Sequence, residues 1–69
     1  MLRELEAAGA QVEYIAAETP TAVLWRRAGY CPFPERPFVV HPVKDGRLAG
    51  SGTFDLTLIE AQAMVGVKP

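Results

Sequence analysis

One stretch of the chain interleaves aromatic rings with arginines. Rings that stack on bases and guanidinium groups that contact phosphates are the usual means of binding single-stranded nucleic acid. The residues with this potential, our candidate ligand-binding or partner-binding residues, are Trp25, Arg26, Arg27, Tyr30, Phe33, Arg36 and, a little further on, His41. Core aromatics beside solvated arginines produce the same pattern, and we favour that interpretation.

Nucleophilic catalysis would have to use Cys31 and His41, which are the single cysteine and the single histidine of the sequence. A thiolate nucleophile needs an adjacent base, and a third group that orients the base is not indicated. A structural zinc site takes four ligands, commonly cysteine and histidine. We therefore expect no catalytic residue, no metal site and no cofactor, and we expect at most a ligand contact or a pH response from His41.

Length and composition narrow the class of protein. The 69 residues make a single domain, 1–69, and at this length apolar burial barely offsets chain entropy. One cysteine excludes an internal disulfide, so self-association remains as the source of added stability. No run is long and apolar enough to span a membrane and the N-terminus does not resemble a signal peptide, so the sequence predicts a cytoplasmic protein. Ten alanines, with five arginines against two lysines, are typical of a GC-rich bacterial or phage source.

The net charge of −1 conceals an uneven distribution. Residues 1–18 hold one arginine against four glutamates, a balance of −3, whereas residues 26–47 hold four arginines and one lysine against two acids, a balance of +3. A basic zone indicates an acidic partner or nucleic acid. We favour the alternative that the acidic N-terminal helix lies near this zone, in the same chain or in a neighbour.

The central element of the predicted fold, which carries His41, is a β-hairpin over residues 38–54. Asp45-Gly46 suits a two-residue type I′ turn, in which both central residues take positive φ. The resulting register places on one face Val39, His41, Val43, Leu48, Gly50, Gly52 and Phe54. The two glycines leave room opposite Val39 and His41 for the close approach of a helix, a second chain or a ligand. Pro42, which has no N–H, predicts an edge or a bulge at that point of the strand.

Thr57 and Glu60 have the spacing of a capping box, which predicts a helix over residues 58–65 that ends at Gly66, with Pro69 beyond. This helix is apolar almost all round, so we expect it to be buried on the hairpin face that carries Val39, or to lie in an interface.

Four further segments complete the chain. We expect a helix over residues 2–8 and a strand over residues 11–17. Residues 19–29 favour a helix with Thr19 as N-cap and Pro20 at its first position, and a strand is the alternative. Three prolines make residues 30–37 a stiff loop.

Residues 14–30, YIAAETPTAVLWRRAGY, resemble the strand–helix–strand near the C-terminus of GNAT-type acetyltransferases. The pyrophosphate-binding glycine motif of that family has no counterpart, and Trp25 stands where many members carry a tyrosine acid, so the resemblance implies a relic of the fold and no acyltransferase. Residues 60–69 are similar to the first helix and turn of helix-turn-helix DNA-binding proteins, but no recognition helix follows. We assign no family.

Together these patterns predict a small α+β domain of order α-β-α-β-β-α, whose antiparallel sheet is built on the hairpin and packs against short helices. We expect a non-enzymatic protein-interaction module that self-associates, as a homodimer, and that has no membrane contact. The alternative is a small nucleic-acid-binding or regulatory protein that uses the basic residues of 26–47.

Overall fold

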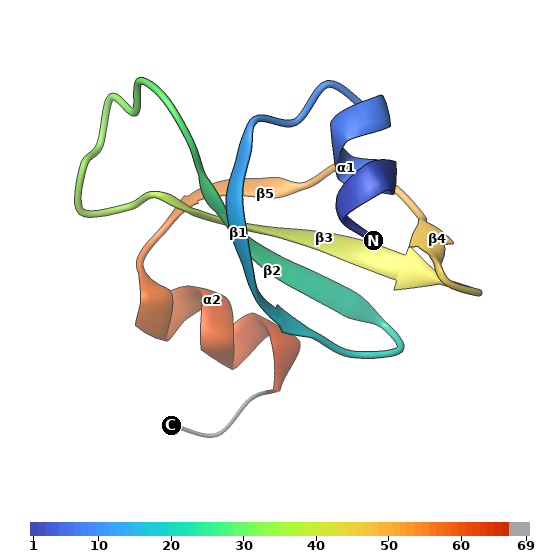
Figure 1. Ribbon diagram of the computed structural model, residues 1–69. Helices are drawn as coiled ribbons and strands as arrows, with labels where there is room; N and C mark the ends of the chain where they lie inside the picture. Colours follow the sequence, from blue (N-terminus) through green and yellow to red (C-terminus); the bar gives the residue numbers. More distant parts are fainter. Residues whose placement is uncertain (67–69) are drawn as a thin grey trace.

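The computed structural model describes residues 1–66, which form an antiparallel sheet with one helix on each face (Figure 1). The elements, in chain order, are α1 (Leu2–Ala7), β1 (Val12–Glu18), β2 (Ala22–Arg27), β3 (Phe38–Lys44), β4 (Arg47–Leu48), β5 (Thr53–Leu56) and α2 (Leu58–Val65). The strands lie in the order β1-β2-β3-β4, and β5 also pairs with β3. The predicted α+β class is confirmed. Pro69 and the end of the helix-turn-helix resemblance lie outside the described residues.

The predicted hairpin is present, but its register changes twice along β3. Asp45 and Gly46 take φ values of 54° and 76°, and Val43 pairs with Leu48 as expected. Further along, Val40 pairs with Thr53, two residues beyond its expected partner, because residues 49–52 leave the ladder. This slip is even, so Phe54 still lies on the face of His41. A second irregularity, between Phe38 and Val40, then pairs Phe38 with Leu56, three residues beyond its expected partner.

Pro42 lies at this irregularity. Its carbonyl accepts the N–H of Ala49 at 2.9 Å, so the missing N–H of Pro42 also faces the side of β3 on which β4 and β5 pair. On that side the pairing with β4 has ended and the pairing with β5 has not begun, so no ladder hydrogen bond is lost. On the other side β3 pairs along its length with β2, where Ala22 is opposite Pro42. The expected interruption is therefore present, but β3 is an inner strand and not an edge.

Residues 19–29 do not form the helix that the sequence favoured. They hold the turn between β1 and β2 and then β2 itself, and the Thr19 hydroxyl accepts the N–H of Ala22 at 3.0 Å in that turn. Residues 22–25 are all buried, because both faces of this inner strand are covered. Burial on two faces outweighs the better separation of charge in a helix. The resemblance of residues 14–30 to the strand–helix–strand of GNAT-type acetyltransferases is therefore wrong, because the segment contains no helix.

Each face of the sheet carries its own core. On one face Leu5 of α1 packs with Val23, Trp25, Val39 and Val43. On the other face Ala61 of α2 packs with Ala22, Leu24, Phe38 and Val40. The last helix was expected on the Val39 face, and this prediction is wrong. α1 covers that face, and α2 covers the opposite apolar face of the sheet. That second apolar face was not expected, because residues 22–27 of β2 were interpreted as part of a helix.

The capping box of α2 is formed as predicted. Thr57 Oγ1 accepts the N–H of Glu60 at 3.2 Å, and a Glu60 carboxylate oxygen accepts the N–H of Thr57 at 2.9 Å. Gly66 ends the helix with φ 78°. Among residues 1–66, neither helix is long and apolar enough to cross a membrane.

Candidate functional site

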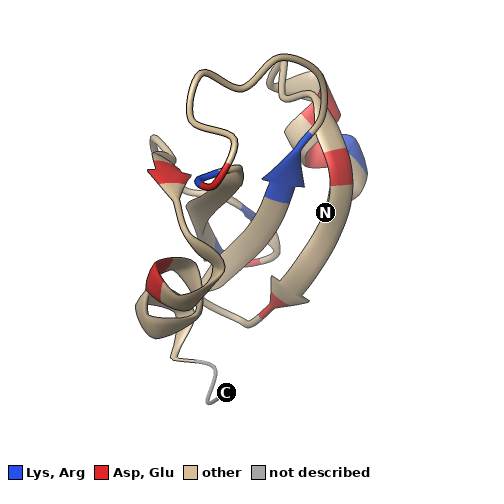
Figure 2. Ribbon diagram, turned by 90° about the vertical axis from the view of Figure 1, so that its left-hand side faces the viewer, with Lys and Arg blue, Asp and Glu red and all other residues tan. Residues whose placement is uncertain are grey.

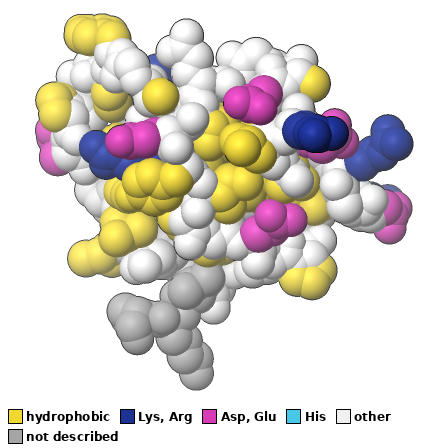
Figure 3. All heavy atoms as spheres, viewed as in Figure 1, with side chains coloured by type: hydrophobic (Ala, Val, Ile, Leu, Met, Phe, Trp, Pro, Cys, Tyr) yellow, Lys and Arg dark blue, Asp and Glu magenta, His cyan; other side chains and the backbone are white. Residues whose placement is uncertain are grey.

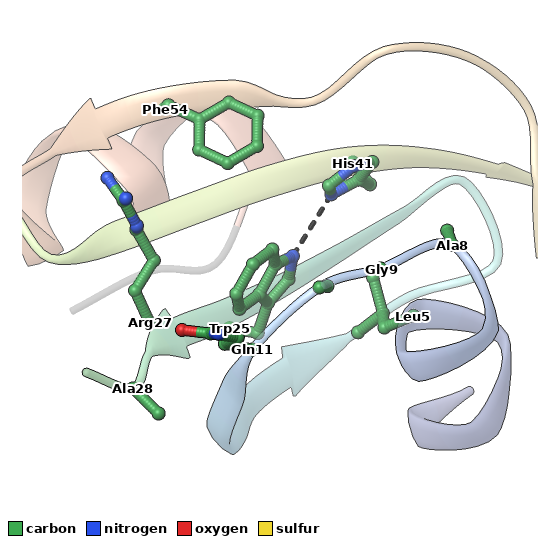
Figure 4. Close-up of a pocket in the computed structure, with 10 residues that line it drawn as sticks. Leu5, Ala8, Gly9, Gln11, Trp25, Arg27, Ala28, His41 and Phe54 are labelled. Carbon is green, nitrogen blue, oxygen red and sulfur yellow. Dashed lines mark hydrogen bonds between the residues drawn. The ribbon is translucent and has the colours of Figure 1, made fainter. Parts of the chain in front are cut away.

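A pocket of about 260 Å³ opens on the face of the sheet that carries α1 (Figure 4). The connection from α1 to β1, residues 8–11, lines one side. Trp25, His41 and Phe54 supply rings from three different strands, and Arg27 lies beyond the indole (Figure 4). Three of the seven predicted candidates, Trp25, Arg27 and His41, are therefore brought together here.

Trp25 and His41 form the centre of the pocket. The indole Nε1–H donates to His41 Nδ1 at 3.0 Å, and the rings are stacked with centroids 5.8 Å apart. Phe54 stands edge-on to both rings. Because Nδ1 accepts a hydrogen bond, the neutral imidazole must carry its proton on Nε2. The contact with Trp25 therefore fixes the tautomer of His41.

Gly52 lies against the imidazole. A Cβ atom at this position would be 2.5 Å from His41 Cε1 and 2.7 Å from Nε2. The two-residue slip brings Gly52 to the place that the sequence had assigned to Gly50, which instead approaches Pro42. The imidazole of His41 itself therefore occupies the space beside Gly52, where the sequence had predicted room for a helix, a second chain or a ligand.

Burial lowers the pKa of His41 from its ordinary value of 6.5. Protonation would also place a second N–H on Nδ1, opposite the indole N–H, and so break the bond to Trp25. His41 is consequently a neutral, flat wall of the pocket at neutral pH.

The basic zone is largely neutralised within the chain. The ion pairs are Arg26–Glu13 at 2.7 Å, Arg27–Asp55 at 3.3 Å and Arg36–Glu60 at 2.7 Å. Figure 2 shows a red band of β1 beside the blue end of β2, where Glu13 and Arg26 pair. The carboxylates come from β1, β5 and α2, so the N-terminal helix that we expected to balance this zone supplies none of these three partners. The N–H of Thr57 and then Arg36 lower the pKa of Glu60.

The remaining candidates lie outside the pocket. Arg26 points to the other face, where it lies over the ring of Phe38. Tyr30 and Phe33 are 85% and 48% exposed in the loop before β3, so they are surface residues and not core aromatics. Trp25, in contrast, is a core residue with 1% exposure.

Cys31 and His41 do not form a catalytic pair. The thiol makes its contacts within its own loop, to the carbonyl of Phe33 at 3.1 Å, and does not line the pocket. Sequence reasoning missed Phe54 as a site residue, although it placed Phe54 on the face of His41. It also missed Gln11 and its neighbours, because their position depends on the β1–β2 hairpin.

Within residues 1–66, no three histidine, cysteine or acidic side chains lie close enough together to hold a metal ion. The structure therefore offers a pocket lined by aromatic rings and one arginine. Comparison with protein-family models, with curated proteins and with solved structures finds no match.

Proposed function

We propose that this protein is a non-enzymatic protein-interaction module that forms a homodimer through the outer face of α2. The observation that carries the proposal is the exposure of this helix. Only Ala61 among its eight residues is buried, whereas Leu58, Ile59 and Met64 are 41%, 79% and 50% exposed. Figure 3 shows hydrophobic side chains at the surface over α2.

The outer face of α2 suits a second copy of the same helix. Ile59 and the small Ala63 lie one turn apart, and both are exposed. In a two-fold antiparallel pair, Ile59 of each copy would fit beside Ala63 of the other, as the self-complementarity of a symmetric interface requires.

The expected affinity is modest. Leu58, Ile59 and Met64 point to different sides of α2, because successive residues are about 100° apart. Burying the exposed parts of all three in each copy, at about 1–2 kcal/mol apiece, would contribute about 6–12 kcal/mol for the pair, which is the upper limit of the gain. Association costs about 4–15 kcal/mol in lost freedom. The largest gain with the smallest cost leaves a surplus of about 8 kcal/mol, which corresponds to a Kd of about 1 µM. The dimer is therefore expected to be weaker than this, with a Kd between micromolar and millimolar.

A cytoplasmic, non-enzymatic role rests on the sequence and the site together. Cys31 has no disulfide partner, which suits a reducing compartment. The one histidine is held by Trp25 and has no nucleophile or acidic group bonded to it among the described residues. These features favour recognition over chemistry.

The nucleic-acid alternative has less support. Arg26, Arg27 and Arg36 each pair with a carboxylate, so much of the positive charge that would attract a phosphate backbone is already neutralised within the chain. Salt-dependent retention on heparin would favour this alternative, and indifference to salt would remove it.

Sedimentation equilibrium from about 10 µM to about 1 mM tests the proposal. The wild-type protein should rise from its 7.5 kDa monomer towards twice that mass. Ile59→Ser should weaken association by at least tenfold, because it removes the central apolar side chain of the proposed interface. The fold itself should be little affected, because Ile59 is 79% exposed. Tyr30→Ser, at an even more exposed aromatic, is the matched control and should sediment like the wild type. A wild-type monomer at the highest concentration would overturn the proposal.

A further inference from the structure

We propose that the pocket beside Trp25 binds a small aromatic carboxylate with a single ring. The inference is independent of the proposed dimer, because the pocket lies on the α1 face of the sheet and the dimer face belongs to α2, which packs on the opposite face.

The size of the pocket limits the ligand. Pockets for drug-sized molecules measure roughly 300–1,000 Å³, and this one measures about 260 Å³. One aromatic ring with a small substituent fits that space. The wall formed by residues 8–10 has only small side chains, so a flat ring can lie close to the backbone there.

The aromatic lining favours a flat ligand. Trp25, His41 and Phe54 already pack as a stacked and edge-on group with centroids 5.8–6.3 Å apart. A further ring can pack against Phe54, which is 47% exposed, and His41, which is half-buried, while the buried Trp25 holds His41 in place. The imidazole is neutral and its tautomer is fixed by Trp25, so His41 contributes a flat surface and no charge.

The charge of the pocket favours an anion. Among residues 1–66, Arg27 is the one charged residue that lines it, and no acidic side chain does. Asp55 takes one N–H of Arg27 at 3.3 Å, a long contact, and a guanidinium has five N–H donors. Arg27 therefore has donors left for a carboxylate, which it recognises best in a bidentate arrangement.

Amide and indole NMR shifts during titration with benzoate test this site. Benzoate should bind saturably in the millimolar range and shift the Trp25 indole N–H and the amides of residues 8–11. Benzamide, a neutral molecule of the same shape, should bind at least tenfold more weakly. Equal binding of the two probes, or benzoate shifts spread away from the pocket, would overturn the assignment.

Two variants identify the contact. Arg27→Met should weaken benzoate at least tenfold, and Arg47→Met, at the turn between β3 and β4, should bind as the wild type does. Equal losses in both variants would mean unspecific attraction of the anion and would overturn the proposal. If Arg27→Met loses its dispersed amide spectrum, Ala8→Phe, which fills the pocket from an exposed position, supplies the test. Benzoate binding that survives Ala8→Phe would contradict the site.

Discussion

Replacing Gly52 by alanine should destabilise the fold through His41. The added methyl group would lie 2.5–2.8 Å from three atoms of the imidazole ring, which is closer than Cβ atoms approach other atoms in proteins. The φ of Gly52 is not positive, so backbone strain contributes nothing and the whole effect comes from this contact.

Two responses bound the magnitude. If the imidazole tilts away, it loses the bond from the Trp25 indole, which costs about 1 kcal/mol. If the ring stays, overpacking costs about 1–3 kcal/mol. We therefore expect the free energy of unfolding to fall by about 2 kcal/mol, which lowers Tm by about 8–16 °C in a domain of this length.

Urea unfolding followed by Trp25 fluorescence measures the change, and Gly50→Ala is the matched control. A Cβ at Gly50 would lie 3.5 Å from a Pro42 side-chain carbon, an ordinary contact, so this variant should stay within about 0.5 kcal/mol of the wild type. In a His41→Ala background the penalty of Gly52→Ala should disappear. A harmless Gly52→Ala, or a penalty that persists without the imidazole, would refute the reasoning.

Three further changes should have measurable effects. Burial lowers the pKa of His41, so below about pH 6.5 the unfolded chain binds a proton at His41 that the folded chain does not bind. The urea midpoint should therefore fall as the pH is lowered, until the pH reaches the pKa of His41 in the folded protein. His41→Gln should flatten this slope. Thr57→Ala removes the capping hydroxyl of α2 and should cost about 1 kcal/mol of unfolding free energy in urea titrations, whereas Ser51→Ala, in the exposed loop before β5, should cost nothing measurable. Ala61→Leu adds volume at the contact between α2 and the sheet, so the free energy of unfolding from thermal melts should fall by about 1–3 kcal/mol. An equal loss from Ala63→Leu, on the exposed side of the helix, would contradict the packing of α2.

The elements predicted correctly are those with strong local signals. The turn at Asp45-Gly46 needs positive φ at both residues, and few other pairs accept that conformation as readily. The helix start at Thr57 depends on hydrogen bonds within four residues. Both signals are complete within a short stretch, so no knowledge of the rest of the fold was needed.

The errors concern choices that only the whole fold decides. Residues 19–29 carry signals for a helix and for a strand, and burial on both faces of the sheet decides for the strand. The face that α2 covers follows from the same fact, because an additional inner strand creates a second apolar surface.

The candidate site was predicted only in part. Trp25, Arg27 and His41 drew attention by residue type, but the pocket also needs residues 8–11 and Phe54, which are far apart in the sequence. Their proximity comes from the β1–β2 pairing and from the two-residue slip beside β3. Neither feature has a signature in a single sequence.

Dilution of the ¹⁵N-labelled wild-type protein from about 1 mM to about 10 µM, followed by amide chemical shifts, tests the central claim most directly. The amides of Leu58, Ile59, Ala63 and Met64 should move together with concentration, while those of residues 8–11 at the pocket should stay fixed. Shifts that do not depend on concentration, or that are confined to another surface, would contradict a dimer formed through α2.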